Sequence, residues 1–261
     1  MIKIFKKDIK NSFKQFKFKL IVPDLIFIII TIFLMNLFAS YNGILSVSQS
    51  ELQSIVIANF GQVLGSLIVF ALAAFFIGAR LKSFKLTMIL DAINNKNLNL
   101  IKSYKDSKKF YWKVVLLKVL AFLVFLLTFT LSLIIYSLLE SNYLRLATIL
   151  PIIIFAVIAL TIFYREAILF IDKKSSTKSL ISAFKFFKKS KVKVLLAALL
   201  IAAINFIIFY SIAIIPVSEN LILGNIISAT TSLILFSVAA WTQLFILILT
   251  KQYRKIKLLL S

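Results

Sequence analysis

Two clusters of lysines are the residues whose type and spacing best suit a chemical task. Within each cluster most lysines are three or four residues apart, so they share one side of a helix. Aromatic and aliphatic residues lie between them, as in a helix that rests in a membrane interface and contacts anionic headgroups. The candidate headgroup contacts are Lys102, Lys105, Lys108 and Lys109 in the first cluster and Lys185, Lys188 and Lys189 in the second.

Other kinds of chemistry lack the residues that they need. The sequence contains no Cys and no His, which excludes disulfides, thiol catalysis, His-containing metal sites and His acid–base chemistry. The basic loops supply no paired carboxylates for general acid–base or metal chemistry. We therefore expect no enzymatic activity, no cofactor and no metal.

Polar residues inside the apolar stretches suggest a second kind of chemistry. They are candidates either for hydrogen bonds between helices, worth around 0.6 kcal/mol each, or for lining a solute path. Gly61 and Gly65 allow two helix backbones to approach closely. The uncharged runs hold none of the ionisable residues expected for ion or proton coupling. The four polar candidates are Asn59, Gln62, Asn205 and Gln243.

Membrane helices are the elements that must position these residues. Hydrophobic residues make up 61% of the 261 residues and charged residues 15%, and the mean hydropathy is +1.03, which excludes an ordinary globular protein. Six uncharged runs each reach the roughly 18–20 residues that a membrane-spanning helix needs. We predict one all-α polytopic membrane domain over 1–261. Its six transmembrane helices are expected near 25–40, 57–79, 116–139, 144–164, 194–216 and 221–250.

The net charge of +22 is a topology signal first. Of the 31 Lys and Arg residues, all but Arg145 lie in four segments on one predicted side of the membrane, and Glu51, Glu140 and Glu219 lie with Arg145 on the other. The positive-inside rule then predicts a cytoplasmic-membrane protein with both termini in the cytoplasm. The expected partners are the bilayer, its anionic lipids and a membrane protein, but not nucleic acid. The four basic segments are 1–24, 80–118, 165–193 and 251–261.

Basic segments outside the spans are expected to form amphipathic helices. Residues 2–20 have a helical period, which fits either an interfacial anchor or a helix packed under the bundle. In the loop 80–115 we predict helices over 84–93 and 98–111, joined by an Asn-rich turn at 94–97. In the loop 165–193 we expect Glu166 and Asp172 to pair with Arg165, Lys173 or Lys174.

The basic amphipathic stretch 180–194 matches 100–114 after a shift of eighty positions, and 12–17 matches part of it. Each stretch leads into two apolar runs, so the chain divides into three units of one basic segment and one membrane hairpin. Two explanations of the match are open. One is internal repetition. The other is the order of residues that lipid imposes on every hairpin: basic headgroup contacts, then an aromatic belt, then an apolar span.

The segment Tyr164–Asp172, a short polar gap and the amphipathic stretch Ser179–Phe184 before the fifth span carry a resemblance. Together they resemble uncharacterised families of six-helix membrane proteins, which are similar to the membrane domain of glycerophosphoryl diester phosphodiesterases. The resemblance implies a six-helix fold and proximity to lipid chemistry. It does not imply the phosphodiesterase activity, which belongs to a separate soluble barrel with catalytic histidines and acidic metal ligands.

Two functions remain open from the sequence. The first is a non-enzymatic membrane protein that binds anionic lipid, or a membrane or cytoplasmic partner, through its basic amphipathic segments. The second is a permease or permease subunit for a small or lipid-like solute, which would pass along the polar residues of the second, fifth and sixth spans.

Overall fold

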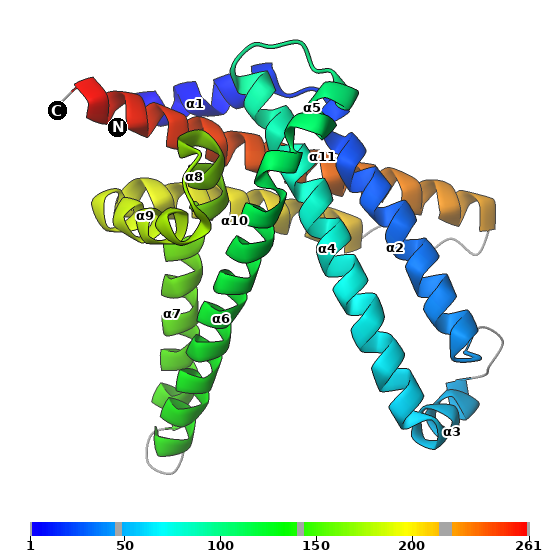
Figure 1. Cartoon of the computed structure of the whole chain (residues 1–261). Helices are drawn as coiled ribbons and strands as arrows, with labels where there is room; N and C mark the ends of the chain where they lie inside the picture. The colour runs from blue at the N-terminus through cyan, green and yellow to red at the C-terminus, as the bar shows by residue number, and fades with distance from the viewer. Residues whose placement is uncertain (1, 45–48, 140–143, 214–220, 260–261) are drawn as a thin grey trace.

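The computed structural model describes residues 2–44, 49–139, 144–213 and 221–259, and all regular structure in these ranges is helical (Figure 1). Six helical segments of this part of the chain are long and apolar enough to cross a membrane: Phe18–Tyr41, Phe60–Ile93, Lys108–Leu138, Ile149–Asp172, Lys191–Ile208 and Thr230–Gln252. The prediction of an all-α polytopic membrane protein with six spans is confirmed.

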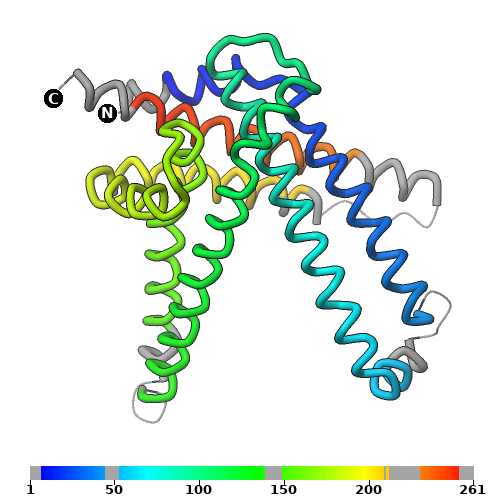
Figure 2. The backbone as a smooth tube through the Cα atoms, in the orientation of Figure 1, coloured from blue at the N-terminus to red at the C-terminus, as the bar shows by residue number. Residues whose placement is uncertain are grey.

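Three pairs of long helices form hairpins. The first joins α2 (Val22–Tyr41) to α4 (Phe60–Ile93) through α3 (Gln49–Ala58), and the second joins α6 (Lys108–Leu139) to α7 (Leu144–Ile162). The third consists of α10 (Lys191–Ala213) and α11 (Leu221–Leu259). The first two hairpins diverge from a common end, and α11 crosses them there (Figures 1 and 2).

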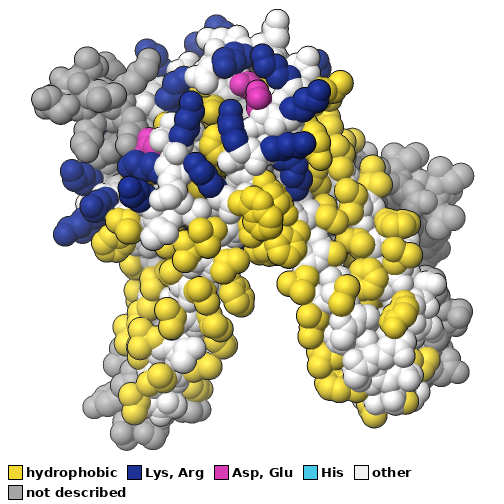
Figure 3. Space-filling view, viewed as in Figure 1, with side chains coloured by type: hydrophobic (Ala, Val, Ile, Leu, Met, Phe, Trp, Pro, Cys, Tyr) yellow, Lys and Arg dark blue, Asp and Glu magenta, His cyan; other side chains and the backbone are white. Residues whose placement is uncertain are grey.

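The common end, which we call the basic cap, is built from the short helices. These are α1 (Ile2–Gln15), the 3₁₀ turn η1 (Phe18–Ile21), α5 (Leu100–Asp106), α8 (Arg165–Asp172) and α9 (Ser176–Lys189). Lys and Arg side chains gather on this cap, and hydrophobic side chains cover the hairpins below it (Figure 3). A short basic helix therefore precedes each hairpin, as the three-unit division predicts.

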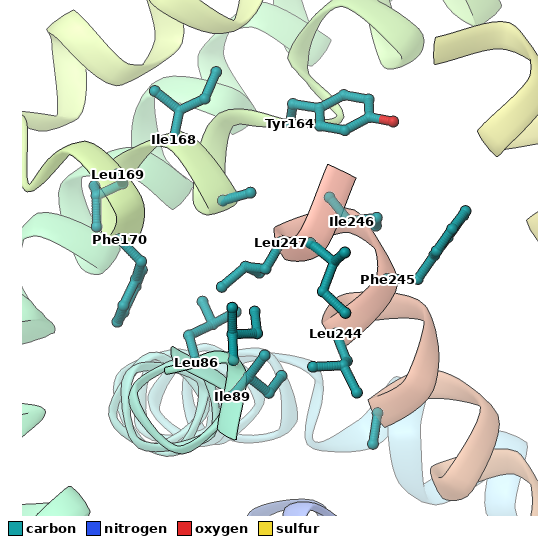
Figure 4. Packing of buried hydrophobic residues seen from close by; sticks show 14 of the residues in the cluster. Leu86, Ile89, Tyr164, Ile168, Leu169, Phe170, Leu244, Phe245, Ile246 and Leu247 are labelled. Carbon is teal, nitrogen blue, oxygen red and sulfur yellow. The ribbon is translucent and has the colours of Figure 1, made fainter. Parts of the chain in front are cut away.

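The hydrophobic core lies beneath the basic cap, where α4, α8 and α11 converge (Figure 4). Far from the cap, α4 has no buried residue between Phe60 and Gly78. Lipid solvates apolar side chains as well as protein does, so the hairpins need no core at their far ends. Core side chains labelled in Figure 4 include Leu86, Ile89, Ile168, Leu169, Phe170, Leu244, Phe245 and Leu247.

The helix predicted over 84–93 is not a separate element, because it continues the second predicted span. The helix α4 continues without a break to Ile93, because every residue from Arg80 onward is compatible with a helix and the chain meets its Asn-rich turn only at Asn94. Asn95 has a left-handed backbone with φ of +55°, as expected for such a turn. The helix expected over 98–111 is divided at Ser107 into α5 and the start of α6.

The first amphipathic segment packs under the bundle, so of the two interpretations the structure favours the packed helix. The helix α1 ends at Gln15 and lies along α11 (Figure 1). The Trp241 Nε1 of α11 donates a hydrogen bond of 3.0 Å to the fully buried Ser12 Oγ, and the Phe13 ring stacks on Trp241 at 5.0 Å between centroids.

Burial supports the equivalence of the second and third units. Residues eighty positions apart are buried in both, at a helical period. The helix breaks do not keep this register, because Ser190, which ends α9, corresponds to Phe110 and not to Ser107. Whether the units arose by repetition stays a prediction. The matched buried pairs are Ser103 and Ala183, Phe110 and Ser190, Val114 and Val194, Leu117 and Ala197, and Ala121 and Ile201.

Candidate functional site

The seven candidate lysines are all exposed on the basic cap, in two groups that belong to neighbouring units. Lys102 and Lys105 lie on α5, Lys108 and Lys109 begin α6, and the second cluster occupies the end of α9. Three ion pairs join described residues, and none of them uses a lysine of either cluster. These ammonium groups therefore form no ion pair within the described ranges.

Buried contacts on the inner side of α9 fix the orientation of its outer side. The Ser175 Oγ accepts a hydrogen bond of 3.4 Å from the Lys178 N–H and caps the helix. The Ser176 Oγ donates a bond of 2.7 Å to the Lys113 carbonyl, which ties α9 to α6. On the inner side Ala183 is fully buried and the Phe186 ring lies 4.7 Å from that of Tyr164.

The outer side of α9 combines basic and apolar residues. Ile181 is 51% exposed and Phe184 56% exposed, and both lie beside the exposed Lys185 and Lys188. Water alone would not favour two large apolar side chains at these positions. A membrane interface favours them, because it accepts apolar side chains and ammonium groups on the same helix face.

Hydrogen bonds hold α5 against α4. The Asn99 side chain accepts a bond of 3.0 Å from the Lys102 N–H and caps the helix. The Arg80 guanidinium of α4 donates to the Tyr104 carbonyl at 2.8 Å and to the Ser107 Oγ at 2.9 Å, and it lies 4.2 Å from the centre of the Tyr104 ring. The first lysine cluster is therefore presented by a fixed helix.

Charged residues near the core form pairs that the sequence reasoning did not find. The Lys85 ammonium, almost fully buried, binds the Asp24 carboxylate of α2. Glu166 pairs at 3.1 Å with Lys82 of α4, and not with Arg165, Lys173 or Lys174 as expected. The expected pairing of Asp172 with Lys174 is confirmed at 3.5 Å. The lone Asp24 at the start of an otherwise uncharged span is the signal that could have suggested a buried cation.

A buried carboxylate belongs to the contact between α1 and α11. Asp8 is 2% exposed. Burial raises the pKa of Asp8 above its ordinary value, although a hydrogen bond with Gln252 and the charges of Lys193 and Lys7 act in the opposite direction. Protonation of this carboxyl group therefore favours the docked position of α1.

The four polar candidates for a solute path are dispersed. The Asn59 amide donates to the Ile55 carbonyl at 3.3 Å, and Gln62 donates to the Tyr41 carbonyl at 3.3 Å, both at the end of the first hairpin far from the basic cap. Asn205 donates to the Ile201 carbonyl of its own helix at 2.8 Å. Gln243 belongs to α11, and its Oε1 is buried without a hydrogen-bond partner in the described structure.

The glycine pair does not join two helices of the described chain. A Cβ added to Gly61 or to Gly65 would meet no atom within 4 Å. Both glycines instead line an open groove of about 830 Å³ between α2 and α4, together with Gln62, Ser66 and apolar side chains.

The fold and the cap define the class, a multi-pass helical membrane protein with a basic end. No protein-family model, curated protein or solved structure matches the chain.

Proposed function

We propose that this is a non-enzymatic protein of the cytoplasmic membrane, with both termini in the cytoplasm, and that its basic cap binds anionic lipid headgroups. The observation that carries the proposal is the exposed pairing of lysines with large apolar side chains on α9. The same combination recurs on α5, where Ile101 is 70% exposed beside Lys102 and Lys105. A headgroup layer is the environment that suits both kinds of side chain.

The charge balance supports a negatively charged partner. Basic residues near an anionic leaflet contribute about 1 kcal/mol each, and the seven cluster lysines have no carboxylate partner within the described ranges. Passage of a solute has less support, because the residues that would line its path lie on separate parts of the bundle and three of them donate their hydrogen bonds to backbone carbonyls.

Fluorescence of the two tryptophans offers a direct test. Trp112 is 69% exposed on α6, one helical turn after Lys108 and Lys109, whereas Trp241 is 5% exposed. Brominated lipids that contact a tryptophan quench its emission, so Trp112 reports the lipid beside the first cluster and Trp241 serves as the shielded reference. The protein would be reconstituted with phosphatidylcholine and phosphatidylglycerol, one of which is brominated in each experiment.

We expect brominated phosphatidylglycerol to quench Trp112 with a preference of about fivefold, which corresponds to the roughly 1 kcal/mol of one basic residue at an anionic surface. Changing Lys102, Lys105, Lys108 and Lys109 to Gln should remove most of this preference. The matched control changes the exposed Lys7, Lys10 and Lys14 of α1 and Lys17, which follows it, an equal loss of charge, and should leave the preference in place. Equal quenching by both lipids in the unmodified protein would refute the proposal and assign the lysines to another partner.

A further inference from the structure

One lysine lies apart from the exposed clusters, inside the angle between the first two hairpins. Lys118 is six residues beyond Trp112 on α6, which places its backbone about 9 Å deeper along the helix. Its Nζ lies 5.6 Å from the centre of the Phe75 ring of α4, and a Cβ on Gly78 would lie 3.7 Å from it. The Lys118 side chain therefore reaches α4 at Gly78, where the Phe27 ring of α2 also packs.

No described residue forms a hydrogen bond or an ion pair with the Lys118 ammonium. Its charge interacts with Glu166, but the Glu166 carboxylate is within bonding distance of Lys82 instead. An ammonium on a membrane-spanning helix is costly unless it reaches a partner. A half-buried lysine with three unused donors at this depth therefore indicates a missing anion.

The surrounding charges favour an anion further. Lys82, Lys118 and Arg165 interact electrostatically with Glu166, so three cations share one carboxylate. Lys85 adds no free charge, because Asp24 neutralises it. Two positive charges are thus uncompensated where α4, α6 and α8 meet, a place that we call the apex.

Below the apex the two hairpins separate. The Phe76 and Trp112 rings, 6.5 Å apart between centroids, join α4 to α6 close to Lys118. Farther from the cap, α4 exposes Leu67, Ile68 and Leu72, and α6 exposes Phe122 and Leu126. Hydrophobic side chains cover both sides of the opening between the hairpins (Figure 3). A hydrocarbon chain fits such an opening, and a charged or hydrated group does not.

We propose that one anionic phospholipid binds at the apex, with its phosphate at Lys118, Lys82 and Arg165 and its acyl chains between α4 and α6. This site goes beyond the exposed lysines of the cap and does not depend on them. It differs from a general surface attraction because it holds a single lipid, which the protein would retain in detergent.

Native mass spectrometry of the full chain in detergent tests this site. The probes are dioleoylphosphatidylglycerol, dioleoylphosphatidylcholine and glycerol 3-phosphate, which has a phosphate but no chains. We expect one phosphatidylglycerol per protein to be retained in preference to phosphatidylcholine, and glycerol 3-phosphate not to displace it. Lys118→Gln should weaken retention by about tenfold or more, because a charge-assisted contact is lost. Lys118→Arg should preserve it, as should Lys10→Gln, an equal charge change on α1.

A second variant keeps the test decisive if Lys118→Gln folds poorly. Glu166→Gln removes the carboxylate that competes with the phosphate and frees Lys82, so retention of phosphatidylglycerol should become tighter. Unchanged retention in Lys118→Gln, looser retention in Glu166→Gln, or displacement by glycerol 3-phosphate would each overturn the proposal. A lipid at the apex would also lie close to Trp112, so the variants separate the two proposals. A quenching preference lost with Lys102, Lys105, Lys108 and Lys109 belongs to the cap, and a preference that persists without them but is lost in Lys118→Gln belongs to the apex.

Discussion

The buried pair of Lys85 and Asp24 gives the sharpest prediction, because its two members are buried unequally. The Lys85 side chain is 2% exposed and the Asp24 side chain is 25% exposed. Lys85 lies in the core below the basic cap, whereas Asp24 lies in the first turn of α2, where the helix dipole also favours a negative charge. Loss of Asp24 should therefore lower the free energy of unfolding by a different amount from loss of Lys85.

Removal of Asp24 leaves a buried ammonium without a partner, so Asp24→Leu should lower the free energy of unfolding by about 3–5 kcal/mol. Lys85→Met replaces the lysine with an apolar chain of similar length and leaves a carboxylate that water can reach. We expect this variant to lose only about 1–2 kcal/mol. The double variant should be close to Lys85→Met, because no unpaired charge remains in the core.

Reversible unfolding in mixed micelles can be followed by circular dichroism as the fraction of denaturing detergent rises. It gives the change in unfolding free energy for each single variant and for the double variant, which together form a double-mutant cycle. Because the double variant should cost no more than Lys85→Met, the expected coupling energy equals the cost of Asp24→Leu, about 3–5 kcal/mol. A cost for Lys85→Met that equals or exceeds that of Asp24→Leu would refute the reasoning, since the asymmetry follows directly from burial. A coupling near zero would show that the two groups do not act as a pair.

Two further predictions concern α1 and the turn after α4. Because burial raises the pKa of Asp8, the docked α1 binds a proton more readily than the free helix, so docking should weaken as pH rises through this raised pKa. Asp8→Asn should abolish this pH dependence of docking, which Trp241 emission reports in a Trp112→Phe background. Trp241 emission that does not change with pH while Asp8 is intact would contradict the prediction. Because Asn95 has φ of +55°, Asn95→Val should cost about 1 kcal/mol of stability and Asn95→Gly almost nothing. Thermal unfolding measures both costs, and equal effects of the two substitutions would contradict the backbone argument.

Six spans can be predicted from this sequence because lipid forces every apolar run of sufficient length into a helix. The extent of α4 could not be predicted in the same way. A charged residue ends an uncharged run, but it does not end a helix whose neighbours supply a partner. Arg80 binds the carbonyl of Tyr104, Lys82 binds Glu166 and Lys85 binds Asp24, so α4 continues past all three.

The exposed lysines of the candidate site follow from helical spacing, which shows which residues share a face. The apex does not follow from spacing, because its residues come from three helices far apart in sequence. Lys118 and Lys82 become neighbours only when α6 docks on α4 at Gly78, and Glu166 joins them only when α8 docks on both. Hydropathy contains no information about that docking.

The distribution of carboxylates explains why lipid is the expected partner of both sites. Three acids near the cap pair with cations that face the interior or the cap itself: Asp24 with Lys85, Glu166 with Lys82 and Asp172 with Lys174. Asp8 is buried, and Asp91 accepts a hydrogen bond from Ser103. The remaining cations, on α5, on α9 and at Lys118, outnumber the one carboxylate among them, Asp106 of α5, so they repel one another unless further anions come from outside the chain. In a membrane the anions at this depth are lipid phosphates, so the charge excess that predicts topology also predicts the ligand.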